Sequence, residues 1–213
     1  MTSPLRPQRA SADPGSESRS YHHGDLKRAL IESAKDILRN EGQEALTLRA
    51  VARAAGVSPT APYRHFADRR SLVAAVAEEG FHEMGLAMRH AMAVEGGRKG
   101  FKQIGLAYVR FAHEHSAEYR VMFGAELAQR DDLPGLLQQS RSVIEFVAHG
   151  IAELQKAGVV GPGEPRTLAV TVWAVLHGLV MLSLDGQTAA SGLSVDELVE
   201  EATRMIMFGM APR

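Results

Sequence analysis

The chain has 213 residues, 45% of them hydrophobic, which is enough to bury the core of one large or two small domains. It contains no cysteine, which excludes disulfides, thiolate zinc sites and cysteine nucleophiles. The formal net charge is −1, but residues 21–70 carry nine Lys and Arg against six Asp and Glu, whereas residues 71–213 carry twelve against seventeen. A basic N-terminal part on an acidic remainder suits a protein whose N-terminal part alone meets phosphate.

The first segment, residues 1–20, is predicted to be a disordered arm. It is rich in Pro, Ser, Arg and Ala and has almost no large apolar residue. It also lacks the apolar centre of a signal peptide. A helix is then predicted from Tyr21 to about Glu41, with Lys27, Lys35 and Arg39 off its apolar face. That face consists of Leu26, Leu30, Ala34, Ile37 and Leu38.

The stretch from Thr47 to Phe66 predicts two short helices joined by a tight turn. Thr47 suits the N-cap of the first, because its hydroxyl can accept from a first-turn N–H. Gly56 follows the last apolar residue of that helix, where a left-handed residue ends a helix. Ser58 is predicted to cap the second helix, with Pro59 at the first helical position. This is the pattern of a helix-turn-helix, whose second helix enters the DNA major groove.

The second predicted helix carries the polar chemistry that separates DNA binding from an ordinary helical hairpin. Donors to phosphate oxygens and base edges crowd into six residues, at Thr60, Tyr63, Arg64 and His65. Pro62 lies near the fourth helical position, where it removes one hydrogen bond and disfavours helical geometry in the preceding residue. A distorted or 3₁₀ first turn is therefore predicted.

These motifs resemble the DNA-binding region of the TetR family of bacterial repressors. The matching strings are Leu46-Thr47-Leu48-Arg49, Ala55-Gly56-Val57-Ser58 and Tyr63-Arg64-His65-Phe66, followed by a basic helix start at Arg69 and Arg70. The DNA-binding set predicted on this basis is Thr47, Arg49, Ser58, Thr60, Tyr63, Arg64, His65 and Arg69. Within it, phosphate contacts are assigned to Thr47, Tyr63, His65 and Arg69, and base contacts to Arg49, Thr60 and Arg64.

Four more helices are predicted between Phe66 and a Gly- and Pro-rich loop. The first starts after the cap Asp68, runs to about Ala93 and stops at Gly96 and Gly97. The others cover Phe101 to His113, Ser116 to Phe123, and Pro134 to the residue before Gly158. A Gly- and Pro-rich loop follows at 161–165.

Leu168 to Leu184 contains no acid or base other than His177. It is slightly short for a membrane span, and a helix that is apolar nearly all round is otherwise buried on every side. In a chain of this length, that predicts burial against a second subunit. Ser194 to Glu197 forms a capping box that opens the last helix.

Trp173, His177 and Gly178 resemble the signature of a TetR subgroup named for a Trp-His-Gly C-terminal domain. The residues predicted to line an effector pocket are Tyr108, Phe111, Met122, Phe123, Phe146, Trp173, His177 and Met181. The same residues also suit an ordinary helical core, and that alternative stays open. No cofactor and no metal site is predicted, because His113, Glu114 and His115 lack the helical spacing that ligands need.

The sequence as a whole therefore predicts an all-α, nine-helix, TetR-like fold. Residues 1–20 are the arm, 21–67 the helix-turn-helix domain and 68–213 the ligand-binding and dimerisation domain. The predicted protein is a cytoplasmic, ligand-responsive transcriptional repressor. It is expected to be a homodimer through its last two helices, to bind a palindromic double-stranded operator, and to be released by a small-molecule effector of unknown identity. The alternatives are an all-α ligand-binding or scaffold protein without DNA function, and a small helical enzyme.

Overall fold

The computed structural model describes residues 23–210, so the arm predicted for residues 1–20 lies outside the described part. That part consists of eight α-helices and four short 3₁₀ helices, labelled η, and contains no strand. The first elements are α1 (His23–Glu41), η1 (Gln43–Ala45), α2 (Leu48–Ala54) and η2 (Ala61–Arg64). They are followed by α3 (Arg69–Glu95), α4 (Gly97–Glu114), α5 (Ser116–Met122), η3 (Ala125–Leu127), α6 (Pro134–Lys156), α7 (Pro165–Leu184), η4 (Ala189–Ser191) and α8 (Val195–Gly209). The all-α prediction is confirmed, although one predicted α-helix is replaced by η2.

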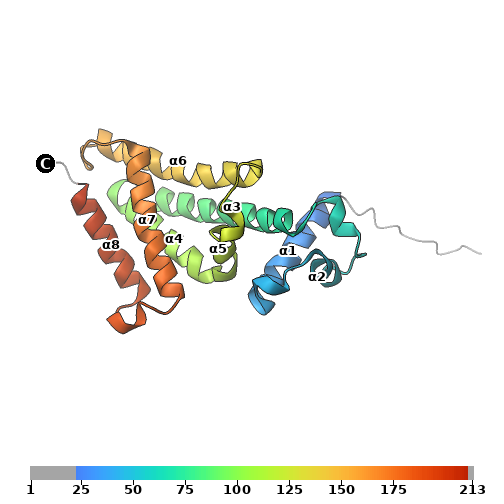
Figure 1. The fold of residues 1–213 in the computed structure, drawn as a ribbon. Coiled ribbons are helices and arrows are strands. Elements are labelled where there is room, and N and C mark those ends of the chain that lie inside the picture. Colours follow the sequence, from blue (N-terminus) through green and yellow to red (C-terminus); the bar gives the residue numbers. More distant parts are fainter. Residues whose placement is uncertain (1–22, 211–213) are drawn as a thin grey trace, which may run out of the picture.

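The molecule has a small N-terminal group of helices, here called the head (residues 23–67), and a larger helical body (residues 68–210) (Figure 1). Helix α3 runs out of the head and along the body, where it packs against α4, α5 and α6. Helix α7 crosses α6, and α8 packs against α4 and α7 at the end far from the head. The head is attached through α1, which packs against α3 and α5.

Capping side chains set the starts of the main helices. The side chain of Asp68 accepts from the backbone N of Ser71 at 2.7 Å, and the Ser71 hydroxyl accepts in return from the backbone N of Asp68 at 3.1 Å. The predicted starts after Asp68 and at the capping box of Ser194 and Glu197 are both confirmed. Helix α7 begins three residues before the predicted Leu168, because the carboxylate of Glu164 caps it.

Helix α7 is buried on one face only. Ala169, Val172, Leu176 and Val180 are its buried residues. The opposite face exposes Val175 and Leu182 at 44% and 47% of their surface. Within residues 23–210, α7 is the one helix with the length and apolarity of a membrane span, at a mean hydropathy of 1.9. Its packing against α4, α6 and α8 makes it an integral helix of the body, with one apolar side left uncovered in the single chain.

Candidate functional site

The first helix of the helix-turn-helix has the predicted start and end. The Thr47 hydroxyl accepts a hydrogen bond from the backbone N of Ala50 at 3.1 Å, and α2 buries Leu48 and Val51. Gly56 has a φ of +67°, which L side chains rarely adopt, so a glycine is required at the turn. The turn therefore fixes the direction in which the chain leaves α2.

The second element differs from the α-helix predicted from Ser58. It is the 3₁₀ helix η2, with Thr60 at its N-cap and no side-chain cap. The Ser58 hydroxyl lies 3.2 Å from the Thr60 hydroxyl instead of capping the helix. Pro62 is buried and lacks an N–H, and its carbonyl accepts from the backbone N of both His65 and Phe66 at 2.9 Å. The prediction of an α-helix was wrong, and the distortion expected at the proline extends over the whole element.

Six of the predicted DNA contacts lie on the exposed surface of this motif, and His65 is half-buried beside Phe66. The exposed six are Thr47, Arg49, Ser58, Thr60, Tyr63 and Arg64. Tyr63 exposes 54% of its surface although it is a large aromatic residue. The side chains of Arg49 and Arg64 make no hydrogen bond or ion pair with any residue between 23 and 210. Their guanidinium groups are thus available to an external anion.

Arg69 has a different environment from the other predicted contacts. Its Nε donates to the carbonyl of Leu46 at 2.8 Å, one terminal nitrogen donates to the carbonyl of Gln43 at 3.0 Å, and the other binds Glu126 at 2.5 Å. The donors of Arg69 are therefore directed to the head and to η3. This arrangement favours a bracing role over the phosphate contact predicted for it. The neighbouring Arg70 pairs with Asp132 in the same way, with one contact of 3.0 Å.

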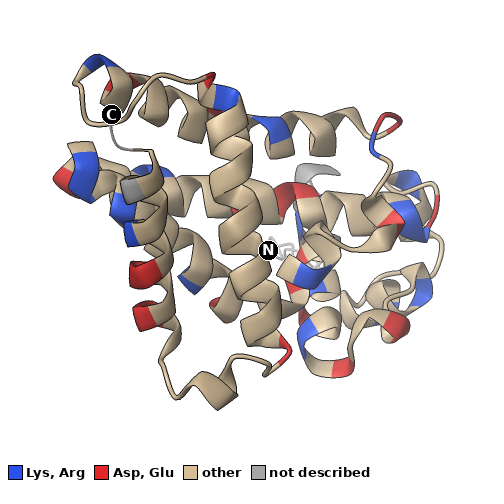
Figure 2. Ribbon diagram, turned by 60° about the vertical axis from the view of Figure 1, so that its left-hand side comes forward, with Lys and Arg blue, Asp and Glu red and all other residues tan. Residues whose placement is uncertain are grey.

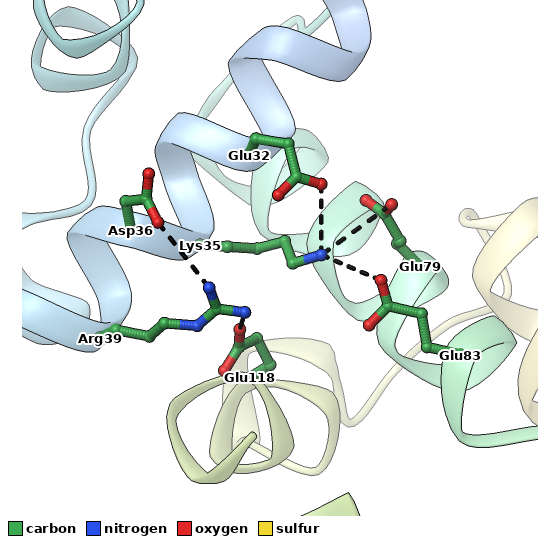
Figure 3. Close-up of polar contacts among 7 residues, drawn as sticks. All are labelled: Glu32, Lys35, Asp36, Arg39, Glu79, Glu83 and Glu118. Atoms are coloured by element: carbon green, nitrogen blue, oxygen red, sulfur yellow. Dashed lines mark hydrogen bonds and ion pairs between the residues drawn. The ribbon is translucent and has the colours of Figure 1, made fainter. Parts of the chain in front are cut away.

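A second set of ion pairs joins α1 to the body (Figure 3). Lys35 exposes only 7% of its side chain and lies among three carboxylates, with Nζ 3.0 Å from Glu83, 3.3 Å from Glu32 and 4.0 Å from Glu79. Burial lowers the pKa of Lys35, but the hydrogen bond and charge of Glu83, with the other two carboxylates, outweigh burial, so the pKa is raised from its ordinary value. Burial raises the pKa of Glu79 despite the charge of Lys35.

The neighbouring pair, Arg39 and Glu118, links α1 to α5 (Figure 3). Glu118 exposes 2% of its surface, and neither carboxylate oxygen makes a hydrogen bond within the described residues. The ion pair with Arg39 is therefore what balances this buried charge. Lys35 and Arg39 lie off the apolar face of α1, as the sequence predicted. Lys35 is nevertheless buried against the body, which the sequence did not indicate, whereas Arg39 stays exposed.

The body contains a cavity of about 380 Å³ between α3, α4, α6, α7 and α8. Most of its wall is apolar, and its large apolar lining residues include Phe81, Met84, Met88, Phe101, Ile104, Val147, Trp173 and Leu176. The polar and charged residues that line it include Tyr108, Ser140, Thr203, Arg130, Arg141 and Arg166. Volume and lining are those of a small-molecule site.

Three of the eight predicted pocket residues line this cavity: Tyr108, Phe123 and Trp173. Met122 is fully buried beneath it, where its sulfur approaches Gly80. The remaining four, which are not part of the cavity wall, are Phe111, Phe146, His177 and Met181. The helical period marked the apolar faces correctly, but several helices present such faces and only their packing decides where a void remains. The residues on α3 that the sequence did not assign to the pocket, Phe81, Met84 and Met88, are among the buried residues of that helix.

His177 belongs to a buried polar network behind the cavity wall. The Tyr119 hydroxyl lies 2.7 Å from His177 Nδ1 and 2.5 Å from the hydroxyl of Tyr108, which is itself a cavity residue. Burial lowers the pKa of His177 and so favours its neutral form. Burial also raises the pKa of both tyrosines. The histidine is thus linked through Tyr119 to Tyr108, a residue of the cavity wall.

Among residues 23–210, no group of three or more His, Asp or Glu side chains is placed to hold a metal ion. The candidate sites are therefore the exposed polar surface of the head and the cavity of the body.

Comparisons with known proteins agree with this division. Residues 30–76 match the family model of bacterial regulatory proteins of the tetR family, and residues 101–206 match that of the tetracyclin repressor-like C-terminal domain. A solved protein of unknown function from Rhodococcus sp. RHA1 is 33% identical, with a TM-score of 0.81 over 91% of this chain and 100% of that one. A TetR family transcription regulator from Marinobacter aquaeolei VT8 is 20% identical, with a TM-score of 0.67 over 88% of this chain and 96% of that one. A comparison with curated proteins found no match.

Proposed function

Because the chain belongs to the TetR family of regulators and is a DNA-binding transcriptional regulator, we propose that it is a homodimeric repressor released from a palindromic operator by a small molecule in the body cavity. The observation that carries the proposal is the combination of a helix-turn-helix with unpaired exposed arginines and a largely apolar cavity in one chain. The motif formed by Trp173, His177 and Gly178 supports placement in the Trp-His-Gly subgroup, and a cytoplasmic location fits a protein that binds the genome.

On the DNA side, we assign base contacts to Arg49, Thr60 and Arg64 and phosphate contacts to Thr47, Tyr63 and His65, with Ser58 beside Thr60 in the same surface. All except the half-buried His65 are exposed. Arg69 is reassigned as a brace that holds the head against η3, because its donors already bind Leu46, Gln43 and Glu126. These roles follow from which side chains are available to an outside partner.

On the dimer side, the uncovered face of α7 supports pairing through α7 and α8. A Cβ added at Gly178 meets no atom within 4 Å, so this position leaves room for a close approach by another helix. The face carries no charge between Arg166 and Asp185, and α7 is the long uncharged helix at the centre of Figure 2. A two-fold dimer then places two heads on two half-sites.

The segment formed by α5 and η3 is the proposed route from the cavity to the head. It touches the cavity side through Met122, whose carbonyl accepts from Arg130 at 2.7 Å. It touches the head directly through the ion pair of Glu118 with Arg39, and indirectly through Glu126, which pairs with Arg69, whose other donors bind the head carbonyls of Leu46 and Gln43. An effector that favours one position of this segment would change the separation of the two heads, to the extent that it binds that form more tightly.

The function is tested by selecting bound sequences from a random pool of duplex DNA with the purified chain. We expect a palindrome whose binding weakens steeply with salt. An unenriched pool would contradict the proposal and favour the alternative, a helical binding or scaffold protein without DNA function.

The same selection separates the two kinds of DNA contact. Arg49→Ala is expected to flatten the preference at one base pair of each half-site, a loss of about 1–3 kcal/mol. Tyr63→Phe, the matched variant from the phosphate set, is expected to weaken binding on all sequences alike, because a phosphate contact carries no base information. An unchanged sequence preference for Arg49→Ala would show that this residue does not contact a base.

A further inference from the structure

We infer that the effector is an amphiphilic organic carboxylate, with its apolar part inside the cavity and its carboxylate bound by Arg130 at the wall. The inference rests on the proposed function, since it gives the chemical class of the molecule in the same cavity. It is carried by the surroundings of Arg130 and by the charge and polarity of the wall.

Arg130 is a half-buried cation without an acidic partner. Its Nε donates to the carbonyl of Leu127 at 2.9 Å, one terminal nitrogen donates to the carbonyl of Met122 at 2.7 Å, and the guanidinium lies 5.2 Å from the ring centre of Phe81. Within residues 23–210, no carboxylate forms an ion pair with it, and its second terminal nitrogen makes no hydrogen bond. Burial lowers its pKa, which is the sign of a charge that its surroundings do not balance.

Two other covered cations of this molecule have acidic partners. The buried Lys35 has three carboxylates around it, and the half-buried Arg69 binds Glu126. An uncompensated charge away from water is costly, whereas a cation that also binds an anion is stabilised. The two backbone carbonyls fix the plane of the Arg130 guanidinium and leave one edge for that anion.

The other charged side chains of the cavity wall are also positive. Arg141 and Arg166 also line the cavity, and no Asp or Glu does. The side chain of Arg141 makes no hydrogen bond or ion pair with the described residues, and the Arg166 guanidinium lies 3.5 Å from Glu145, which is outside the wall. This bias is local, because residues 71–213 carry seventeen acids against twelve bases. A cavity wall whose charged residues are all arginines, in a body with a net negative charge, attracts anionic ligands and disfavours cationic ones.

The apolar lining decides what the remainder of the ligand is. Methionine, phenylalanine, isoleucine and valine side chains from α3, α4 and α6 fill most of the wall, and Trp173 closes it from α7. A sugar phosphate or a nucleotide would leave its hydroxyls unpaired against this surface. An alkyl or aryl chain gains about 0.8 kcal/mol for each buried CH₂ group. The lining therefore favours an alkyl or aryl body over a polar one.

The test measures ligand binding to the full-length chain in the absence of DNA. The probes are decanoate and 4-phenylbutyrate, each compared with its uncharged amide of the same shape. Trp173 is the single tryptophan and lines the cavity, so its fluorescence reports binding directly, and titration calorimetry confirms the affinity. We expect at least one carboxylate to bind at least tenfold more tightly than its amide. Equal binding of acid and amide, or no binding by either carboxylate, would overturn the inference.

Three variants test which arginine side chain binds the carboxylate of the probe. Arg130→Gln is expected to remove the preference for carboxylate over amide, and Arg130→Lys to keep part of it, which a purely bracing role for this side chain would not produce. Arg204→Gln, an exposed arginine on α8 paired with Glu201, is the control and should keep the full preference. If Arg130→Gln does not fold, Arg141→Gln replaces it, and we expect a preference reduced at least threefold. A full preference in whichever of these two glutamine variants is measured would contradict the inference.

The two proposals can fail separately. Carboxylate binding without any selected DNA palindrome would leave the ligand class standing and remove the repressor function. A selected palindrome with no discrimination between acid and amide would do the reverse.

Discussion

Val175→Asp combined with Leu182→Asp is expected to convert the dimer to a monomer and to weaken operator binding at least about 100-fold. Both side chains lie on the uncovered face of α7 and expose nearly half of their surface in the single chain. Aspartates there remain hydrated in a monomer but would be buried without partners in a dimer. A lone head keeps its own contacts and loses the second half-site, which supplies most of the avidity. Light scattering gives the mass, and a titration of labelled operator gives the affinity.

The matched control for this variant is Leu86→Asp. Leu86 exposes 50% of its surface on α3, whose main packing partners are α4, α5 and α6. We expect it to stay dimeric and to bind the operator normally. A dimeric Val175→Asp, Leu182→Asp chain would place the interface elsewhere, and a monomer with full operator affinity would contradict the two-fold binding mode.

Lys35→Met, at the contact between head and body, is expected to lower the free energy of unfolding by about 2–3 kcal/mol at pH 7. Breaking a buried ion pair typically costs 3–5 kcal/mol. Here the loss is smaller, because Glu79 and Glu83 expose 29% and 34% of their side chains and water screens part of their repulsion. Without the cation, Glu32, Glu79 and Glu83 repel one another across the contact between α1 and α3.

The pH dependence of this loss has a defined sign. In the wild type, the pKa of Lys35 is raised, so its contribution is complete below the pKa of the unfolded chain and is lost only as pH rises through the folded pKa. In the variant, the repulsion requires ionised carboxylates. The deficit should therefore be largest near pH 7 and shrink as pH falls through the raised pKa of Glu79. A deficit that grows on acidification would contradict this account of the cluster.

Urea unfolding followed by circular dichroism measures both effects. The protein concentration is held fixed, because the proposed dimerisation would itself contribute to stability. The control is Lys156→Met, which removes an exposed cation paired only with Glu153 on the same helix. Its effect should stay within about 0.5 kcal/mol at every pH. A similar small effect for Lys35→Met would show that the ion cluster does not hold the head to the body.

Local signals in the sequence determined most of the secondary structure. Thr47, Asp68 and Ser194 mark helix starts, because a side-chain oxygen next to a free N–H stabilises a helix end whatever surrounds it. Gly56 marks the turn because of its positive φ. The sequence also predicted a distortion at Pro62. It did not predict that the whole element would be a 3₁₀ helix, because that depends on how the proline is buried within the head.

Only the tertiary structure decides where the cavity lies and which contacts hold the head to the body. The spacing of apolar residues predicted pocket positions for Tyr108, Trp173, Phe111 and Phe146 alike. Only Tyr108 and Trp173 line the cavity, because its place depends on how five helices pack together. Lys35, Arg69 and Glu118 are ordinary charged residues in the sequence, and they become a brace only when α1, α3, α5 and η3 pack together. The sequence by itself thus determined most of the helices, several of their caps and the family resemblance. Which charges are buried, which are paired and that Arg130 lines the cavity depended on packing between residues far apart in the chain.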